Sequence, residues 1–196
     1  MTSNKSLKDR LIQTAMNLFA QKSYNEVTVD EIIQAAGTSK GGFYYYFKSK
    51  EELLLYWLPH IEELYVNWYE NSDKSLPADQ QLVNFCRYSL RTTECETSPA
   101  MLSEIYSAQL KISHKERLIH VQRNLYVILA DIARIGQERG ELSREDSYKT
   151  ISRILVTAIR GSMYEWCLSN GASSLEESGI KIIEHLVSSF KQKSDV

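Results

Sequence analysis

The chain contains little cysteine, proline or glycine: three, three and eight residues among 196. Cys86, Cys95 and Cys167 are odd in number and lack the spacing of metal ligands. We therefore expect small buried thiols in a reducing compartment, with neither a disulfide framework nor a metal site. The scarcity of proline and glycine also argues against disordered segments and repeat arrays.

Long apolar runs are missing as well. No stretch approaches the ~18 apolar residues of a membrane span, and the first residues, MTSNKSLKDR, lack the apolar core of a secretion signal. We expect a cytoplasmic protein with no membrane partner.

There is also no H-E-x-x-H, no G-x-S-x-G, no phosphate-binding glycine loop and no strand pattern. The sequence thus predicts no enzyme, no catalytic residue and no cofactor.

The charge is distributed unevenly along the chain. Residues 1–50 contain seven Lys or Arg and four Asp or Glu, whereas the whole chain has a net charge of −2. An N-terminal excess of positive charge fits a domain that faces phosphate, followed by one that does not.

The stretch from Thr28 to Lys50 has the outline of a helix-turn-helix. Thr28 and Glu31 have the spacing of a capping box at the start of a helix, and Gly37 is a natural helix end. Ser39 can cap a second helix, and Ser49 with a glutamate three residues later has capping-box spacing again. A preceding apolar stripe over residues 6–21 predicts a first helix that completes a three-helix domain.

The second helix of this pair, over residues 40–47, is too short to be stable alone and carries two glycines, each costing about 1 kcal/mol relative to alanine. Close approach to another surface would explain them, and DNA is the surface we favour. The lysines can reach bases or phosphates, and the hydroxyls can donate to phosphate oxygens. The alternative is simple core packing, which we expect of Phe43 and Phe47. The predicted DNA-binding residues are Thr28, Ser39, Lys40, Gly41, Gly42, Tyr44, Tyr45, Tyr46 and Lys50.

Ser39-Lys40-Gly41, Tyr44, Phe47 and Ser49-Lys50-Glu51, after Ala36-Gly37, resemble the DNA-binding signature of the TetR/AcrR family of transcriptional regulators. The resemblance covers about residues 7–54; Tyr46 departs from it, since many members have histidine there. It implies an all-α fold of about nine helices, with a helix-turn-helix DNA-binding domain over 1–48 and an effector-binding and dimerisation domain over 49–196. It also implies a regulator, in most cases a repressor, that binds a palindromic operator in double-stranded DNA as a homodimer.

The remaining pattern is helical. A long helix from Lys50 is expected to kink or break near Trp57–Leu58 because of Pro59, which would be either a passive kink or a hinge. Further helices are predicted over about 78–93, 99–110, 118–139, 144–169 and 174–191.

By the same resemblance, the last two helices are where two copies pair into a four-helix bundle. The predicted dimerisation residues are Ile151, Leu155, Ala158, Ser162, Ile183, Val187 and Phe190. Small residues, among them Gly161, would let another helix come close. Burial of these faces inside the monomer is the competing interpretation.

An all-helical domain with many aromatic residues can hold a small-molecule pocket between its helices. The candidate lining residues are Phe85, Tyr88, Met101, Tyr106, Tyr126, Tyr164 and Trp166, each of which could instead be ordinary core. The effector we expect is hydrophobic or amphipathic and releases the protein from DNA. The alternative function is a DNA-binding dimer without small-molecule response, which is constitutive or controlled by a protein partner.

Overall fold

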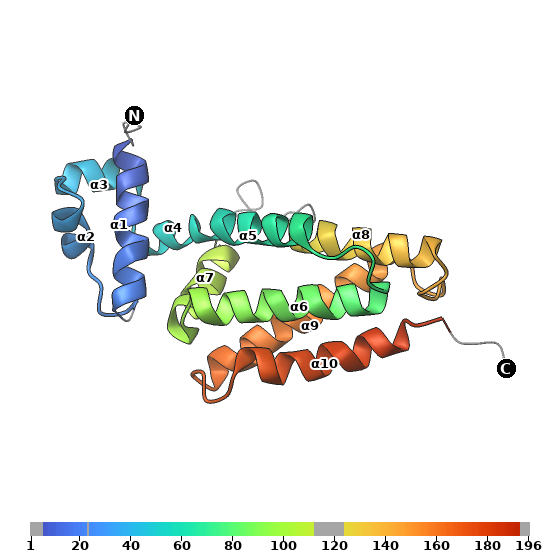
Figure 1. Cartoon of the computed structure of the whole chain (residues 1–196). Helices are drawn as coiled ribbons and strands as arrows, with labels where there is room; N and C mark the ends of the chain where they lie inside the picture. The colour runs from blue at the N-terminus through green and yellow to red at the C-terminus, as the bar shows by residue number, and fades with distance from the viewer. Residues whose placement is uncertain (1–5, 23, 112–123, 193–196) are drawn as a thin grey trace. The chain divides into compact units, whose positions relative to one another are not determined.

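The computed structural model describes residues 6–22, 24–111 and 124–192, which form helices joined by turns and loops, with one isolated bridge between Leu142 and Lys191 (Figure 1). Its ten helices are α1 (Leu7–Gln21), α2 (Val29–Ala35), α3 (Lys40–Tyr46), α4 (Lys50–Leu54), α5 (Trp57–Asn71), α6 (Ala78–Glu96), α7 (Pro99–Lys111), α8 (Asn124–Glu138), α9 (Tyr148–Leu168) and α10 (Leu175–Ser189). The predicted all-α class is confirmed. None of the described helices is both long and apolar enough to cross a membrane.

The chain divides into two compact units, residues 1–60 with 96–118 and residues 61–95 with 119–196. We call them the first and the second unit. The predicted boundary after residue 48 separates a DNA-binding domain from an effector-binding and dimerisation domain. It concerns function and not this division into compact units, so it stays a prediction. Residues 118 and 121, which the sequence placed at the start of a helix, lie outside the described residues.

The first unit is built on the apolar stripe of α1. Leu11, Ala15 and Phe19 are buried where α1 packs against α2 and α3 (Figure 1, blue). Ser6 caps α1 in a complete capping box, since its hydroxyl accepts from the backbone N–H of Asp9 at 3.2 Å and its own N–H donates to the Asp9 carboxylate. The sequence therefore places the first helix correctly.

Of the two other predicted capping boxes, the one at Thr28 forms in part and the one at Ser49 does not form. Thr28 Oγ1 accepts from the backbone N–H of Glu31 at 3.1 Å, but the Glu31 carboxylate pairs with Lys22 instead of returning to Thr28. Ser49 makes no capping bond from its side chain, and Glu52 accepts from the backbone N–H of Lys48 at 2.7 Å. Nearby charges and free amides compete for the same carboxylates, so spacing alone did not determine the partner.

The predicted long helix after Lys50 is broken into α4 and α5. The break lies at Leu55–Tyr56, two residues before the expected place, and Pro59 occupies the first turn of α5. A proline is well tolerated there because the first amides of a helix have no partner within it. The expected break is thus confirmed, while the choice between a passive kink and a hinge stays open. Because the predicted long helix is split into α4 and α5, the described residues form ten helices rather than about nine.

The second unit is held together by polar contacts between helices as well as by its core. Tyr65 of α5 exchanges a hydrogen bond with Ser89 of α6 at 3.2 Å. Glu94 of α6 caps the start of α10, since its carboxylate accepts from Ser174 Oγ and from the Glu176 N–H, each at 3.0 Å. Helix α10 consequently runs alongside α6 (Figure 1).

A second polar cluster joins α5 to α8. The Tyr69 hydroxyl donates to Asp131 at 2.7 Å, and Arg134 donates to the same carboxylate at 2.5 Å. Burial alone would raise the pKa of Asp131, but these two donors outweigh it and hold the pKa below its ordinary value. The carboxylate is therefore charged at neutral pH and fixes the end of α5 on α8.

Candidate nucleic-acid interface and effector cavity

Helix α3 is seated on the first unit by a few aromatic side chains. Phe43 and Phe47 are fully buried, and Tyr24 packs nearby with its ring on Phe19 at 5.0 Å between centroids. The Ser39 hydroxyl accepts from the Gly42 N–H at 3.2 Å and so caps the helix. The core role predicted for Phe43 and Phe47 is confirmed.

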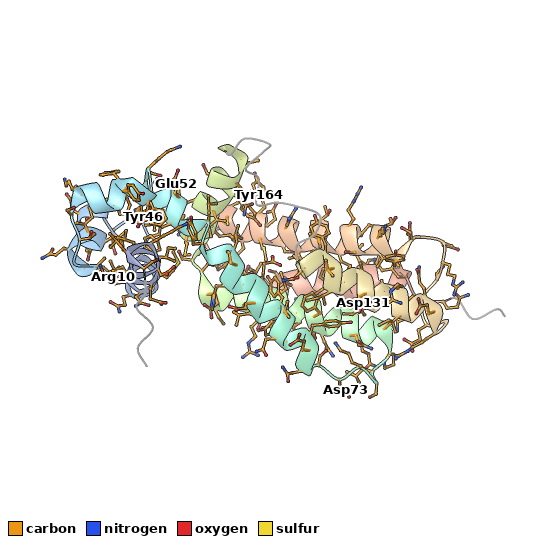
Figure 2. The ribbon with its side chains drawn as sticks, turned by 90° about the horizontal axis from the view of Figure 1, so that it is seen from above. Arg10, Tyr46, Glu52, Asp73, Asp131 and Tyr164 are labelled. Atoms are coloured by element: carbon orange, nitrogen blue, oxygen red, sulfur yellow. The ribbon has the colours of Figure 1, made fainter. Side chains whose placement is uncertain are left out.

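The other side of α3 is open to solvent. Tyr44 is 54% exposed, Tyr45 80% and Tyr46 38%, and Lys40 at the start of the helix is exposed as well. Figure 2 labels Tyr46 on this helix. Three exposed phenols on a seven-residue helix form an uncommon apolar and hydrogen-bonding surface, which is typical of a binding site. Thr28 and Ser39 are exposed beside it, at the starts of α2 and α3.

The two glycines of α3 have different roles. A Cβ added to Gly42 would lie 2.4 Å from Thr38 Oγ1 and 3.4 Å from Leu7 Cδ2, so this glycine is needed for packing within the unit. A Cβ added to Gly41 would meet only Ser39 Oγ, at 3.8 Å. Gly42 thus has a packing reason of its own, whereas close approach to DNA would explain Gly41, and the predicted DNA contacts of both glycines stay predictions.

Lys50 also requires correction. Its ammonium donates to the backbone carbonyls of Tyr24 at 2.7 Å and Val27 at 2.8 Å, and it lies over the Tyr24 ring. Burial lowers the pKa of Lys50. This lysine joins α4 to the loop before α2 rather than reaching toward phosphate. Lys48, which the sequence reasoning passed over, is exposed directly after α3 and is the better placed cation.

An acidic residue missed in the sequence lies beside the predicted interface. Asp30 of α2 pairs with Lys40 of α3 at 3.0 Å, and both side chains are largely exposed. The pair raises the pKa of Lys40, so its ammonium stays charged. The two residues lie at the starts of adjacent helices joined by a short turn. This placement is the sequence signal that could have predicted the ion pair. Asp30 is a negative charge that any approaching phosphate would meet.

The seven predicted effector residues are divided between the two units. Met101 and Tyr106 lie on α7 of the first unit, whereas the other five belong to the second unit. Phe85 and Trp166 are core residues, and Tyr164 is 57% exposed. Because aromatic residues at helical spacing mark a core as often as a pocket, the list of effector residues stays a prediction.

A cavity of about 400 Å³ nevertheless lies in the second unit, between the end of α5 and the start of α6. We call it the Trp68 cavity, after the ring that lines it. Tyr88 is the one predicted effector residue among its described lining. Tyr126, by contrast, is partly covered by the Arg160 guanidinium, 5.3 Å from its ring centroid.

The predicted dimerisation residues are mostly core of a single chain. Ile151, Leu155, Ser162, Ile183, Val187 and Phe190 are each at most 7% exposed, and Ala158 is half-buried. The competing interpretation, burial inside the monomer, is thus the one the structure supports, because α9 packs on both α8 and α10.

A different strip of α9 faces outward. Gly161, Tyr164 and Leu168 follow one another at helical spacing, and the two larger side chains are 57% and 64% exposed. A Cβ added to Gly161 would meet no atom within 4 Å in the part of the chain that the structure describes. Figure 2 shows Tyr164 projecting from this helix. We call these three residues the α9 strip. On α10, Ile182 is 50% exposed in addition.

A three-helix unit that buries one side of a short second helix and exposes the other defines a helix-turn-helix protein. Comparison with known proteins agrees. Residues 11–56 match the family model described as bacterial regulatory proteins, tetR family. The HTH-type transcriptional regulator QacR of Staphylococcus aureus is 27% identical over 161 residues, which cover 80% of this chain and 84% of QacR. Residues 11–56 thus match the DNA-binding part of the tetR family, and over most of its length the chain is similar to TetR-family transcriptional regulators.

Two further comparisons show how much of the chain is similar to known proteins in sequence and in fold. The uncharacterized HTH-type regulator YerO of Bacillus subtilis is 42% identical over 72 residues, but these are 37% of this chain and only 24% of YerO. The structure of Thermus thermophilus FadR, a TetR-family repressor in complex with lauroyl-CoA, has a TM-score of 0.69 at 21% identity and covers 96% of this chain and 97% of that one. The latter shows a shared fold across both units.

Proposed function

We propose that this chain is a ligand-responsive transcriptional regulator, a repressor, that binds a palindromic operator as a homodimer and is not an enzyme. The observation that carries the proposal is α3: its buried side is fixed by Phe43 and Phe47, while Lys40 and the three tyrosines are exposed. In a helix-turn-helix protein, the second helix enters the major groove, where lysine reaches bases and phenols reach phosphates.

Two copies are required for a palindromic operator, and the α9 strip supports a symmetric pair. A glycine in the middle of an exposed helix costs about 1 kcal/mol relative to alanine, and no described residue lies close enough to require it at Gly161. A second copy of the same helix would explain it, because glycine allows two helix backbones to approach closely. Tyr164 and Leu168 would then be covered in the dimer.

An effector would act by shifting a two-state equilibrium. The two recognition helices of a dimer must lie about 34–36 Å apart to enter successive major grooves. An effector that binds more tightly to a state with the wrong separation releases the operator in proportion to that difference in affinity. The Thermus thermophilus protein of the same fold binds lauroyl-CoA, which supports a small-molecule effector with an apolar part but not its chemical class.

Fluorescence anisotropy tests the DNA-binding part of this proposal. The labelled duplex is the sequence upstream of the gene for this protein, at about 50 and about 200 mM salt. We expect tight binding that weakens more than tenfold at the higher salt, because phosphate contacts release counterions. The double variant Lys40→Ala/Tyr44→Phe should lose this binding, while Lys181→Ala, an exposed lysine on α10, should not. Equal loss in both variants would contradict the assignment of α3.

A further inference from the structure

We propose that the Trp68 cavity binds a small planar aromatic cation whose N–H groups donate hydrogen bonds, and that this ligand class supplies the effector. The effector role rests on the proposed function, whereas ligand binding in the cavity does not. The cavity has a volume of about 400 Å³ and lies wholly within the second unit. That volume suits a compact ligand of one or two rings.

Two facing helices supply aromatic walls. Trp68 of α5 and Tyr88 of α6 stack with their ring centroids 5.3 Å apart and their planes 22° apart, and Phe85 supports Trp68 from 5.4 Å. Trp68 and Tyr88 are only half-buried and both line the cavity. The buried Phe85 fixes the pair, so the remaining ring surface is a preformed platform for a planar ligand and, through the electron-rich ring faces, for a cation.

Amide side chains surround this platform. Asn67 and Asn71 project from α5, one turn apart, and Gln81 and Asn84 from α6. Asparagine is a poor helix former, so three of them at one cavity call for a reason beyond helix stability.

Some of these amides have their N–H groups already in use. Asn71 Nδ2 donates to the Asn67 carbonyl oxygen at 2.8 Å and to Asn67 Oδ1 at 3.1 Å. Gln81 is 8% exposed and its Nε2 donates to the Leu76 carbonyl oxygen at 2.6 Å. The amide oxygens of Asn71 and Gln81 therefore remain as acceptors within the described surroundings. Because these amide oxygens can still accept hydrogen bonds, they favour a ligand that carries N–H donors.

The charge of the lining selects the sign of the ligand. Asp73, in the loop after α5 (Figure 2), is the one ionisable carboxylate among the described lining, which contains no lysine or arginine. Ser75 donates to Asp73 from its hydroxyl at 2.6 Å and its N–H at 2.8 Å, which lowers the pKa of Asp73. The neighbouring Lys74 ammonium is held by the Tyr69 carbonyl and by Ser72 Oγ.

This chemistry does not fit an acyl-CoA. Its phosphates require basic side chains, which the described lining lacks, and a whole acyl-CoA is larger than a cavity of about 400 Å³. An aromatic amidine or a protonated aromatic amine, in contrast, places a ring on Trp68 and Tyr88 and its N–H groups toward Asp73 and the amide oxygens. The ligand class thus differs from the lauroyl-CoA bound by the Thermus thermophilus relative.

Isothermal titration calorimetry of the full chain without DNA tests the cavity, using benzamidine, benzamide and benzoate, which share a ring and differ in charge. We expect benzamidine to bind with a dissociation constant of about 1 mM, the range reached by ligands of this size, benzamide more weakly and benzoate not detectably. Asp73→Asn should weaken benzamidine about fivefold and leave benzamide unchanged. Trp68→Leu should weaken both.

The matched control is Glu70→Gln, which removes an exposed carboxylate near the end of α5 and outside the described lining. It should leave all three affinities unchanged, and a thermal melt of each variant shows that it is folded. Absence of benzamidine binding at 10 mM, equal binding of benzoate, or an equal effect of Glu70→Gln and Asp73→Asn would overturn the cavity assignment.

The effector role has a separate readout. Benzamidine at saturation should weaken operator binding in the anisotropy assay, and Asp73→Asn should require about fivefold more of it. Benzamidine that binds in the calorimeter but leaves the operator complex intact would overturn the effector role alone. A chain that binds no operator at all would refute the proposed function, while the calorimetric result would still decide the cavity.

Discussion

Replacing Gly161 by arginine tests whether the α9 strip is the dimer face. In a single chain the new side chain starts in open space, since a Cβ at this position has no neighbour within 4 Å among the described residues. The monomer should therefore be as stable as the wild type or more stable, by up to about 1 kcal/mol, because arginine is a better helix former than glycine. In a dimer built on the strip, the same side chain would force the two helices apart.

The loss expected in the dimer follows from the exposed side chains. Complete burial of a large apolar side chain contributes about 1.5–3 kcal/mol. Tyr164 and Leu168 are 57% and 64% exposed, so covering them recovers about 1 kcal/mol each. Two copies of each then give about 4 kcal/mol, on the order of a thousandfold in the dissociation constant of the dimer.

Sedimentation equilibrium at 1–50 µM protein, concentrations about the usual range for such dimers, measures this change. We expect a dimeric wild type and a monomeric Gly161→Arg with an unchanged or higher melting temperature. Gly161→Ala serves as the matched control, because a methyl group changes the helix propensity with little added bulk. Operator affinity should fall with the dimer. A Gly161→Arg protein that stays dimeric would refute the strip, and a monomeric wild type would refute the dimer itself.

Three other predictions concern the two units. Asp30→Asn removes an acid beside the interface and frees the ammonium paired with it, so operator affinity should rise about threefold to tenfold, with a salt slope steeper by about one; anisotropy that shows no gain would contradict this. Gly42→Ala should lower the melting temperature by the equivalent of about 1 kcal/mol, since its Cβ would lie 2.4 Å from Thr38 Oγ1, whereas Gly41→Ala should not; equal effects would refute the distinction. Because the folded-state pKa of Asp131 is lowered, the unfolded chain binds more protons in acid, and stability falls as the pH drops below the ordinary aspartate range through the folded pKa. Asp131→Asn should cost about 1 kcal/mol at pH 7, after allowance for partial exposure, and flatten this acid limb in urea titrations; an unchanged acid limb would count against it.

The helix-turn-helix was predictable because its signals are local. Ser6, Thr28 and Ser39 cap their helices with their own side chains, and Phe43 and Phe47 are the apolar residues of a short helix that has one buried side. Each signal acts within about one turn of the chain. The sequence carries such information directly.

The faces of α9 and α10 were not predictable in this way. A regular apolar periodicity marks the side of a helix that is buried most deeply, and for Ile151, Leu155 and Ile183 that side is the monomer core. The outward strip is shorter, and its main marker is the absence of a side chain at Gly161. Apolar periodicity predicts which side of a helix is more deeply buried. It does not predict which neighbouring helix or chain covers either side.

Lys50 and the Trp68 cavity show a second limit. The carbonyls that hold the Lys50 ammonium belong to Tyr24 and Val27, more than twenty residues earlier in the chain. Likewise, the cavity combines Trp68 from α5 with Tyr88 from α6. Contacts between separate segments depend on how helices pack, which a single sequence does not reveal.

Selection of binding sites from a pool of random duplexes tests the central claim most directly. The full-length protein is incubated with the pool at about 150 mM salt, near the physiological ionic strength, and the bound duplexes are recovered and sequenced. We predict enrichment of a palindrome whose half-sites are about one helical turn, or a multiple of it, apart, and no enrichment with the Lys40→Ala/Tyr44→Phe variant. Failure of the wild type to enrich any sequence would contradict the assignment of this chain as an operator-binding regulator.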